Sequence, residues 1–310
     1  MPITNRWNRW NRRVKSTAAL TTLALLAFTA STAANPAASN EARRLTAREV
    51  VARIQKQVGV PWQSDTVDTF KAGDPDTPVT GIAVTMMATL DVLQRAAAAG
   101  DNLIITHEPT FFDHLDKADQ LPEKDDDAVL AAKRLFISQH NLVIWRFHDH
   151  WHARSPDGIE TGMVHALGWE KFQDAHNQYL FDIPETPLEK LASDIKSKLG
   201  IHIVRVVGDP ALRVTKVAMA PGAAGFSNHA RALEMPGVQT LVIGEAQEWE
   251  TVEYVADAAT EGKQKSLIIL SHIPSEQAGM EECTRWLKTF VTEAPIQFIP
   301  AREPFWSPKP

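Results

Sequence analysis

The same order of features occurs twice in this chain. The segments "DVLQRAAAAGDNLIITHEP" and "VEYVADAATEGKQKSLIILSHIP" each run from a helical pattern through a glycine to an apolar strand and end in His-x-Pro. Two such tripeptides alone would be an easy coincidence, but their shared context argues for a common plan. We interpret the chain as two similar halves, in which His107 and His272 hold equivalent places.

Helical and strand patterns alternate from Leu45 onward, which is typical of an α/β protein with at least partly parallel sheets. We expect a first α/β half in residues 45–165 and a second in 215–303, with the strand "IQFIP" in the second half. Residues 166–214 are expected to form a connector or small subdomain, and 304–310 a tail.

The first forty residues are typical of an export signal. A basic stretch, "RWNRWNRRVKS", precedes the apolar run "AALTTLALLAFTA", and small residues follow with a cleavage point near Ala33 or Ala34. The run is too short to span a bilayer comfortably, although an uncleaved membrane anchor is the alternative. Arg12-Arg13 fits a twin-arginine signal. Residues 1–40 are therefore interpreted as signal peptide and linker, and the mature protein as periplasmic or secreted.

Composition argues against a nucleic-acid binder and against a cysteine-based site. A net charge of -6 argues against a nucleic-acid binder that works by bulk electrostatics. The single cysteine, Cys283, allows no internal disulfide and no thiolate cage for zinc. A metal site would therefore consist of imidazole and carboxylate groups, and no membrane association is expected after signal cleavage.

Imidazole or carboxylate side chains follow four apolar strands, at the point where each strand ends. In open parallel sheets, ligands bind in the crevice beyond the carboxyl ends of the strands. We therefore expect side chains from both halves of the chain to meet there. The residues in these places are His107, Glu108, the run "HDHWH" at 148–152, Glu245, His272 and Glu276.

The chemistry of this set indicates a divalent metal. Neutral imidazoles and ionised carboxylates without thiolate suit Zn, Fe or Mn. Carboxylates can bridge two ions, and two metals about 3.5–4 Å apart form a common hydrolytic site. A dication also favours the neutral, ligating form of each ring, which removes the repulsion between clustered histidines.

The run "HDHWH" has two possible geometries. In an extended segment, His148, His150 and His152 would all point to one side. In a turn, His148 and His152 can take separate roles, one as a metal ligand and one as a proton carrier.

In this order the motifs resemble the Nif-three-like dinuclear-metal-centre proteins, some of which are labelled type-two GTP cyclohydrolase I homologues. The family's first motif reads roughly Thr-His-His-Pro followed by apolar residues, and this chain has "THEPTFF". The resemblance covers about 47 to 303. The family's later motifs are His-x-x-x-Asp, Gly-Glu and His-x-x-x-Glu, matched in order at His148 and His152, at Gly244-Glu245, and at His272 and Glu276.

The resemblance implies a duplicated α/β fold with a metal site between its halves. It also implies ring-shaped hexamers with two divalent ions per subunit. Two positions depart from the family pattern, because Glu108 stands where a second His is expected and His152 where an Asp is expected. Both replacements can ligate, and together they preserve the total ligand charge. The implied ligands are His107, Glu108, His152, His272 and Glu276.

Each of these residues also has a structural alternative. Carboxylates are stabilised near helix N-termini, so Glu108, Glu245 and Glu276 could be helix caps. A lone histidine after a strand is often an ordinary core or surface residue. His148 and His150 could each either orient a metal ligand or take part directly in catalysis.

The sequence therefore favours a metal-dependent hydrolase of the exported compartment, with a small-molecule substrate. Glu245 or His148 would carry the proton from the activated water. Phosphoester, amide and cyclic C–N bonds all fit, whereas export disfavours a cytosolic nucleotide such as GTP. The alternatives are a metal-binding or metal-delivery protein, whose site would be closed by protein ligands, and a ring-forming scaffold.

Overall fold

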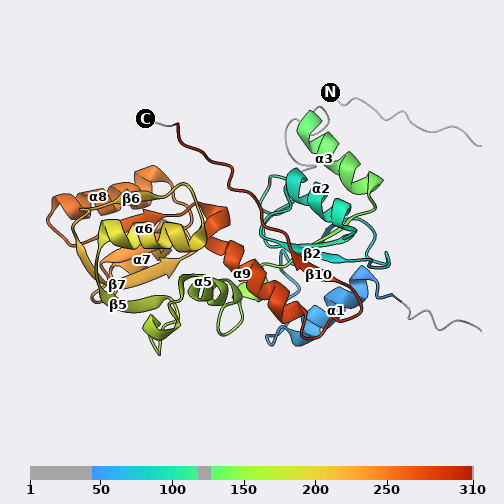
Figure 1. The fold of residues 1–310 in the computed structure, drawn as a ribbon, viewed down its shortest axis with the longest axis horizontal. Coiled ribbons are helices and arrows are strands. Elements are labelled where there is room, and N and C mark those ends of the chain that lie inside the picture. The colour runs from blue at the N-terminus through green and yellow to red at the C-terminus, as the bar shows by residue number, and fades with distance from the viewer. Residues whose placement is uncertain (1–43, 118–126, 309–310) are drawn as a thin grey trace, which may run out of the picture. The chain divides into compact units, whose positions relative to one another are not determined.

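Two five-stranded sheets organise residues 44–117 and 127–308, the part of the chain that the computed structural model describes (Figure 1). The export signal expected in residues 1–40 lies outside this part. No helix in the described ranges is long and apolar enough to cross a membrane.

The first sheet has four parallel strands and one antiparallel edge strand. The register pairs Thr85 with Thr106 and Thr106 with Arg146, so these neighbouring strands end at the same level. The residues that follow them therefore meet at one edge. The strand order is β1 (Phe70–Ala72), β4 (Val143–Arg146), β3 (Leu103–Thr106), β2 (Ile82–Thr85) and β10 (Ile296–Phe298).

Helices lie on both sides of the first sheet. Figure 1 shows α2 (Leu90–Ala99) and α3 (Ala128–Gln139) on one side, and α1 (Ala47–Gln57) and α9 (His272–Leu287) on the other. The α1 helix begins at a reciprocal capping box between Thr46 and Glu49, in which each side chain accepts the other's backbone N–H.

The second sheet has three parallel central strands between two antiparallel edge strands. Residues 166–214, expected as a connector, supply both edge strands. The strand order is β5 (Leu180–Pro187), β7 (Arg213–Ala220), β8 (Thr240–Ile243), β9 (Ser266–Ile269) and β6 (Arg205–Val207).

The two faces of the second sheet bury different helices, as the alternation of side chains along a strand requires. On β7, Val217 and Met219 belong to one core with α5 (Gly158–Leu167) and α6 (Leu188–Leu199). Ala218 belongs to the opposite core, which contains residues of α7 (Phe226–Leu233) and α8 (Glu253–Thr260). A π-helical turn, Glu248–Val252, leads into α8, and a 3-10 turn, Glu170–Phe172, precedes β5.

The repeated unit of the sequence is confirmed. The α2 helix ends at Gly100, which has φ 86°, and leads to β3, while α8 leads through Gly262, with φ 77°, to β9. The two His-x-Pro motifs then diverge. The first opens a loop, whereas the second forms the first turn of α9, where Pro274 is tolerated because its position needs no helical N–H partner.

The C-terminal elements return to the first half, which differs from our expectation. Strand β10 pairs with β2 in the first sheet, and Ile273, Met280 and Cys283 of α9 belong to the first core. The α9 helix begins at His272 and continues through Gly279 without ending there. Gly279 instead permits a close helix contact, since a Cβ there would overlap the backbone of Ile159 in α5.

Candidate metal centre

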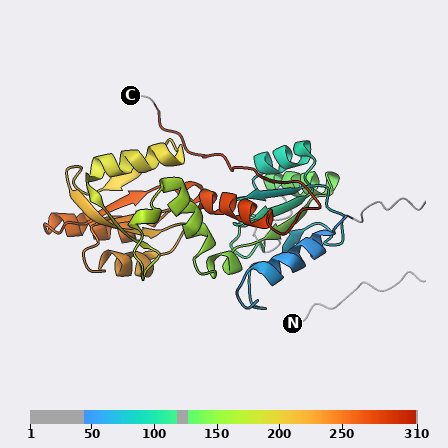
Figure 2. The ribbon, with the colours of Figure 1, turned by 60° about the horizontal axis from the view of Figure 1, so that its bottom comes forward.

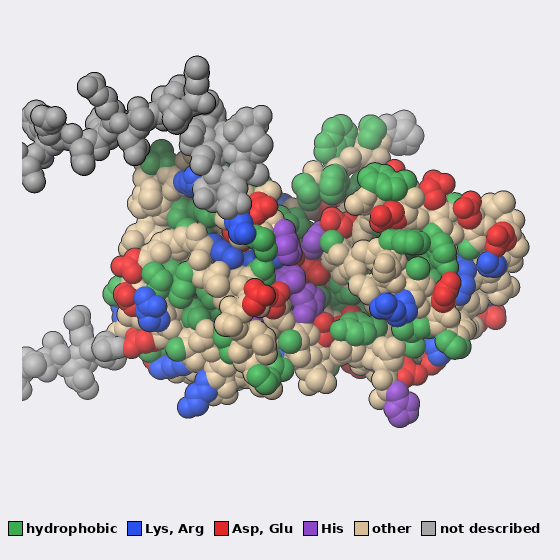
Figure 3. Space-filling view, turned by 180° about the vertical axis from the view of Figure 1, so that it is seen from behind, with side chains coloured by type: hydrophobic (Ala, Val, Ile, Leu, Met, Phe, Trp, Pro, Cys, Tyr) green, Lys and Arg blue, Asp and Glu red, His purple; other side chains and the backbone are tan. Residues whose placement is uncertain are grey.

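The predicted ligands meet at one place, where β3 and β4 end and α9 begins. In Figure 3, histidine side chains gather with acidic side chains in a recess of the surface. His107 and Glu108 follow β3, His272 and Glu276 lie one helical turn apart on α9, and His152 lies on the short helix α4 (Asp149–His152) after β4. The five side chains that the sequence predicted as ligands are therefore brought together.

A carboxylate from outside the motifs makes the "HDHWH" segment turn. Asp68 accepts the backbone N–H groups of three successive residues, at 2.6–2.9 Å, and is itself buried. The N–H of His152 then donates to the carbonyl of His148, which closes one helical turn. His148 and His152 therefore share a helix face, and the turned geometry is the correct one of the two alternatives.

His150 faces away from this cluster. Its Nε2 accepts the backbone N–H of Gln63 at 2.9 Å, so the proton of the neutral ring lies on Nδ1, 2.7 Å from Asp68. The ring also stacks on Trp62 with a centroid separation of 3.6 Å. Because both nitrogens are engaged, His150 is a structural residue.

When both rings are neutral, His107 and His152 point unprotonated nitrogens at each other. Nδ1 of His107 lies 3.1 Å from the carbonyl of Phe147, which can only accept, and Nδ1 of His152 lies 2.9 Å from the carboxylate of Asp157. In both neutral rings the proton is thus on Nδ1, which leaves a lone pair on each Nε2. These two Nε2 atoms are 3.2 Å apart, an arrangement that a shared cation stabilises.

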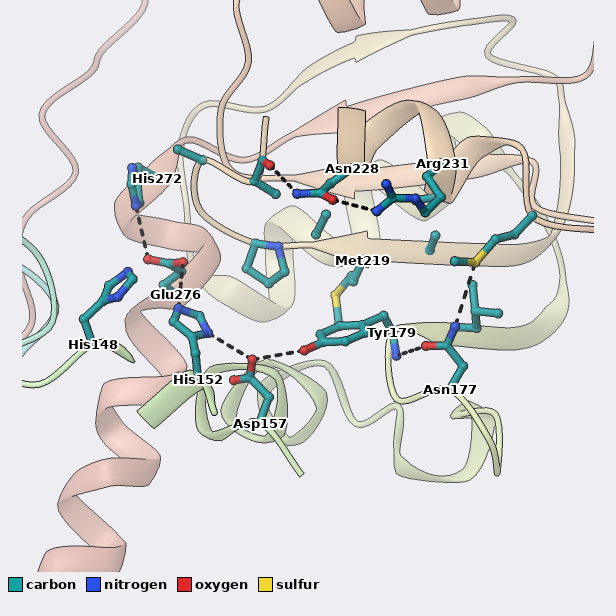
Figure 4. Close-up of a pocket in the computed structure, with 18 of the residues that line it drawn as sticks. His148, His152, Asp157, Asn177, Tyr179, Met219, Asn228, Arg231, His272 and Glu276 are labelled. Atoms are coloured by element: carbon teal, nitrogen blue, oxygen red, sulfur yellow. Dashed lines mark hydrogen bonds and ion pairs between the residues drawn. The ribbon is translucent and has the colours of Figure 1, made fainter. Parts of the chain in front are cut away.

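Glu276 adds a buried acceptor to the same point. Its Oε2 has no hydrogen-bond donor among the described residues and lies 3.6 Å from Nε2 of His107 and 3.2 Å from Nε2 of His272. A buried carboxylate oxygen without a donor is costly unless a cation meets it. The helix-cap alternative for Glu276 is not supported, because its carboxylate faces the rings of His272 and His152 (Figure 4).

The position of Glu276 depends on Gly222. This residue has φ 66°, and a Cβ there would overlap Oε1 of Glu276 and lie 3.3 Å from Nε2 of His272. Its backbone N–H donates to Ser275 Oγ at 2.9 Å, and its carbonyl accepts the N–H of Glu245. The space that the missing Cβ of Gly222 leaves is therefore occupied by the carboxylate of Glu276.

Carboxylates surround His272. Its Nε2 lies 3.3 Å from Oε1 of Glu108, and its Nδ1 lies 3.5 Å from Oε1 of Glu245. Glu245 is half-exposed and lies behind the ring, on the side away from Glu108. Ser271, directly before the ring, has φ 74° and ψ 157°, a backbone region that only glycine adopts readily and that costs on the order of 1–3 kcal/mol.

The pKa values follow these surroundings. Burial lowers the pKa of His107 well below its usual value, and the charges of His148 and His152 lower it further. Burial opposes protonation of His272 as well, but the three carboxylates that surround its ring raise its pKa to about 12. Burial likewise opposes protonation of His152, yet the hydrogen bond to Asp157 raises its pKa. The site therefore contains one imidazole, His107, whose surroundings favour the neutral form, and two, His152 and His272, whose surroundings favour positive charge.

His148 lies among the ligands rather than apart from them. Its Nδ1 contacts the carboxylate of Asp149 at 2.9 Å, and its Nε2 lies 3.5 Å from Oε1 of Glu108. The hydrogen bond from His148 also lowers the pKa of Asp149 below its usual value. His148 therefore has the geometry of a further ligand, in addition to the proton-carrying role suggested by the sequence.

Two buried residues that support the site carried no recognisable signal in the sequence. Asp157 orients His152 and also accepts the hydroxyl of Tyr179 at 3.2 Å. Arg146, fully buried, donates to the carbonyls of His107 and His114 and lies 3.3 Å from Oε2 of Glu108. Burial would raise the pKa of Glu108, but the hydrogen bond to His272 and the nearby positive charges lower it, so this carboxylate stays ionised.

Two groups of these side chains can hold metal ions. Within each group the ligating atoms all lie within 4.8 Å of one another. The donor set is imidazole and carboxylate and includes the orphaned oxygen of Glu276, so the residues present fit a divalent metal. The groups are His107, His148 and His152, and His107, Glu108 and Glu276.

A sequence model of the family described as Duf34/NIF3 (NGG1p interacting factor 3) matches residues 46–304. The chain belongs to the Duf34/NIF3 family. Its match spans both sheets and every predicted ligand.

Relatives of this Duf34/NIF3 chain include two clostridial proteins, each named GTP cyclohydrolase 1 type 2 homolog. The protein from Clostridium acetobutylicum is 24% identical over 197 residues, which are 60% of this chain and 68% of the relative. The protein from Clostridium perfringens is 22% identical over 243 residues, 74% of this chain and 86% of the relative.

The fold of this chain is also found in a solved structure. The Staphylococcus aureus protein SA1388 superposes with a TM-score of 0.68 at 19% identity, over 85% of this chain and 99% of that protein. The expected fold of two similar α/β halves is therefore confirmed.

The role of Gly222 in this Duf34/NIF3 chain can be tested with a matched pair of variants. Gly222→Ala is expected to weaken metal binding about tenfold to hundredfold, because the new methyl group displaces Glu276. Gly225→Ala is the control, since Gly225 also has positive φ, 81°, but no atom lies within 4 Å of a Cβ there. Isothermal titration with Zn²⁺ measures both affinities, and equal losses in the two variants would contradict this role.

Proposed function

We propose that this protein is a metal-dependent hydrolase with a dinuclear centre. The ligands in this proposal are His107, Glu108, His148, His152, His272 and Glu276. Two bound divalent ions would supply a nucleophilic water at neutral pH and polarise the electrophile of the substrate.

The facing lone pairs of His107 and His152 carry the proposal. Their Nε2 atoms, 3.2 Å apart, cannot donate to each other in the neutral tautomers that Phe147 and Asp157 impose. Packing alone would not favour two such acceptors beside a third, the orphaned oxygen of Glu276. Glu276 also reaches both histidines on separate oxygens, at 3.6 Å and 3.9 Å, which suits a bridging carboxylate.

A cavity beside the ligands supports catalysis over storage. Its volume is about 630 Å³, within the range of small-molecule sites, and its wall includes His148, His152, His272 and Glu276. A storage site would be closed by protein ligands, whereas these residues face open space that a substrate can enter.

The residues around the ligands have distinct tasks in this proposal. Asp157 and the carbonyl of Phe147 fix the tautomers of His152 and His107. Glu245 contacts Nδ1 of His272 and is expected to orient that ring, in preference to carrying a proton. His148 lines the cavity and would bind a metal through Nε2, while the contact of its Nδ1 with Asp149 fixes the tautomer that this ligation needs.

The proposal also includes a cellular location and an oligomeric state. We retain the periplasmic or secreted location from the signal-like residues 1–40, and the hexamer from the family resemblance. The names of the two clostridial relatives suggest cyclic C–N bonds as one substrate class, beside phosphoesters and amides.

The test begins with metal stoichiometry of the purified protein after incubation with Zn²⁺, Mn²⁺ or Fe²⁺. Two ions per chain are expected by elemental analysis. Phosphoester, amide, nucleotide and cyclic-amide substrates are then assayed, and hydrolysis of at least one class should disappear with a chelator and return with the metal. Two bound ions without hydrolysis of any class would favour metal delivery, and a chain that binds no metal would end the proposal.

A further inference from the structure

The cavity beside the metal centre extends well past the ligands, onto the second sheet. Its far wall comes from the start of β5 and the residues before it, from β7 with the turn after it, and from α7. In Figure 4, Tyr179 and Met219 lie between the histidine cluster and the opposite end, where Arg231 and Asn177 are found. A substrate that reaches the metals therefore also rests against the second sheet.

The middle of the cavity is apolar. Met219 and Pro221 and a series of alanines line it, and Tyr179 adds an aromatic face whose hydroxyl is already bonded to Asp157. Such a wall favours a flat or aliphatic body that is dehydrated on binding. The apolar members are Leu180, Ala218, Met219, Ala220, Pro221, Ala223, Ala224, Ala232 and Met235.

One positive charge, the exposed side chain of Arg231, stands at the end of the cavity remote from the candidate ligands. Arg231 is the sole Lys or Arg side chain in the cavity wall formed by the described residues, and it makes no ion pair with a carboxylate there. Its Nη1 donates to Oδ1 of Asn228 at 3.0 Å, while Nδ2 of Asn228 donates to the carbonyl of Ala224 at 2.7 Å. Asn228 thus holds the guanidinium beside the cavity and leaves its other donors free.

We propose that the substrate is a small amphipathic molecule with one anionic group, a carboxylate or a phosphate monoester, that binds Arg231 while the scissile group lies at the metals. This inference rests on the proposed hydrolase function. Planar anions pair with guanidinium through two parallel hydrogen bonds, which makes Arg231 an orienting residue at the far end of the substrate. A nucleoside triphosphate fits poorly, because a single arginine faces its several charges.

Hydroxamates provide the probe, because they chelate active-site metals without being turned over. Phenylalkyl hydroxamates of graded linker length would carry a para carboxylate, a para phosphate, a para methyl ester or no substituent. Isothermal titration into the Zn²⁺-loaded protein measures each affinity. At the best linker length, one of the two anions is expected to bind about tenfold or more tightly than the ester, since hydrogen bonds to charged groups are the stronger ones. The preferred anion identifies the substrate's charged group.

Arg231→Gln should abolish the preference for the anion over the ester, leave the unsubstituted hydroxamate unchanged and retain the full metal content. Arg205→Gln is the matched control, because Arg205 is exposed on β6, paired with Glu248, and absent from the cavity wall. Hydroxamates that bind the wild-type protein without an anion preference, or a preference that survives Arg231→Gln, would overturn this inference alone. If no hydroxamate binds the metal-loaded protein, the metal-anchored pocket is wrong and both proposals fall.

Discussion

His107→Ala is expected to purify with little bound metal. His107 is fully buried, its Nε2 faces His152 and Glu276, and it belongs to both groups of candidate ligands. Its loss removes a donor from each group, so metal content should fall from two ions per chain to well below one. Elemental analysis after dialysis measures this, and His272→Ala is expected to lose metal as well.

The matched control for His107→Ala is His202→Ala. His202 is exposed, precedes β6 and lies outside both ligand groups among the described residues, so this variant should keep the wild-type metal content. Normal metal content in both His107→Ala and His272→Ala would mean that these imidazoles converge for another reason, and the centre would not exist.

Arg146→Met is expected to lower the free energy of unfolding by about 3–5 kcal/mol, the range found when one partner of a buried ion pair is removed. The arginine is completely buried and satisfies the carbonyls of His107 and His114 together with the carboxylate of Glu108. Methionine fills a similar volume but donates no hydrogen bond. Urea denaturation followed by circular dichroism measures the change.

Arg48→Met controls for the loss of a positive charge in the Arg146→Met experiment. Arg48 pairs with Asp76 on the surface, where both side chains are more than half exposed, so little change is expected. A comparable, small effect for both variants would show that the hydrogen bonds of Arg146 do not hold the loop after β3. Metal affinity should also fall in Arg146→Met, because Glu108 loses its support.

The sequence was sufficient to predict the strand ends as the place of the site. Parallel strands of equal register end together, so the residues after β3 and β4 had to be neighbours, and an apolar strand is easy to recognise. The repeated helix–glycine–strand unit likewise predicted that His107 and His272 hold equivalent places at the ends of their strands.

The supporting residues could not be predicted, because they act across long separations in sequence. Asp68 captures backbone N–H groups that lie 80–82 residues later, and nothing in the segment around Asp68 identifies those partners. The return of β10 to the first sheet was missed for a related reason. A short apolar strand carries no information about which sheet it joins. The α9 helix separates β9 in the second sheet from β10 in the first, and this connection is recognisable only when the positions of both sheets are known.

Because α9 packs into the first core, the candidate ligands on α9 and those after β3 and β4 are held by the same hydrophobic core. In the proposed function, the second sheet and α7 would supply the surfaces that the substrate touches, including Met219 on β7 and Arg231 on α7. If the proposed function holds, metal binding and substrate selection would depend on separate parts of the protein. Substitutions on the second sheet and α7 would then change which compounds bind without changing the metal ligands.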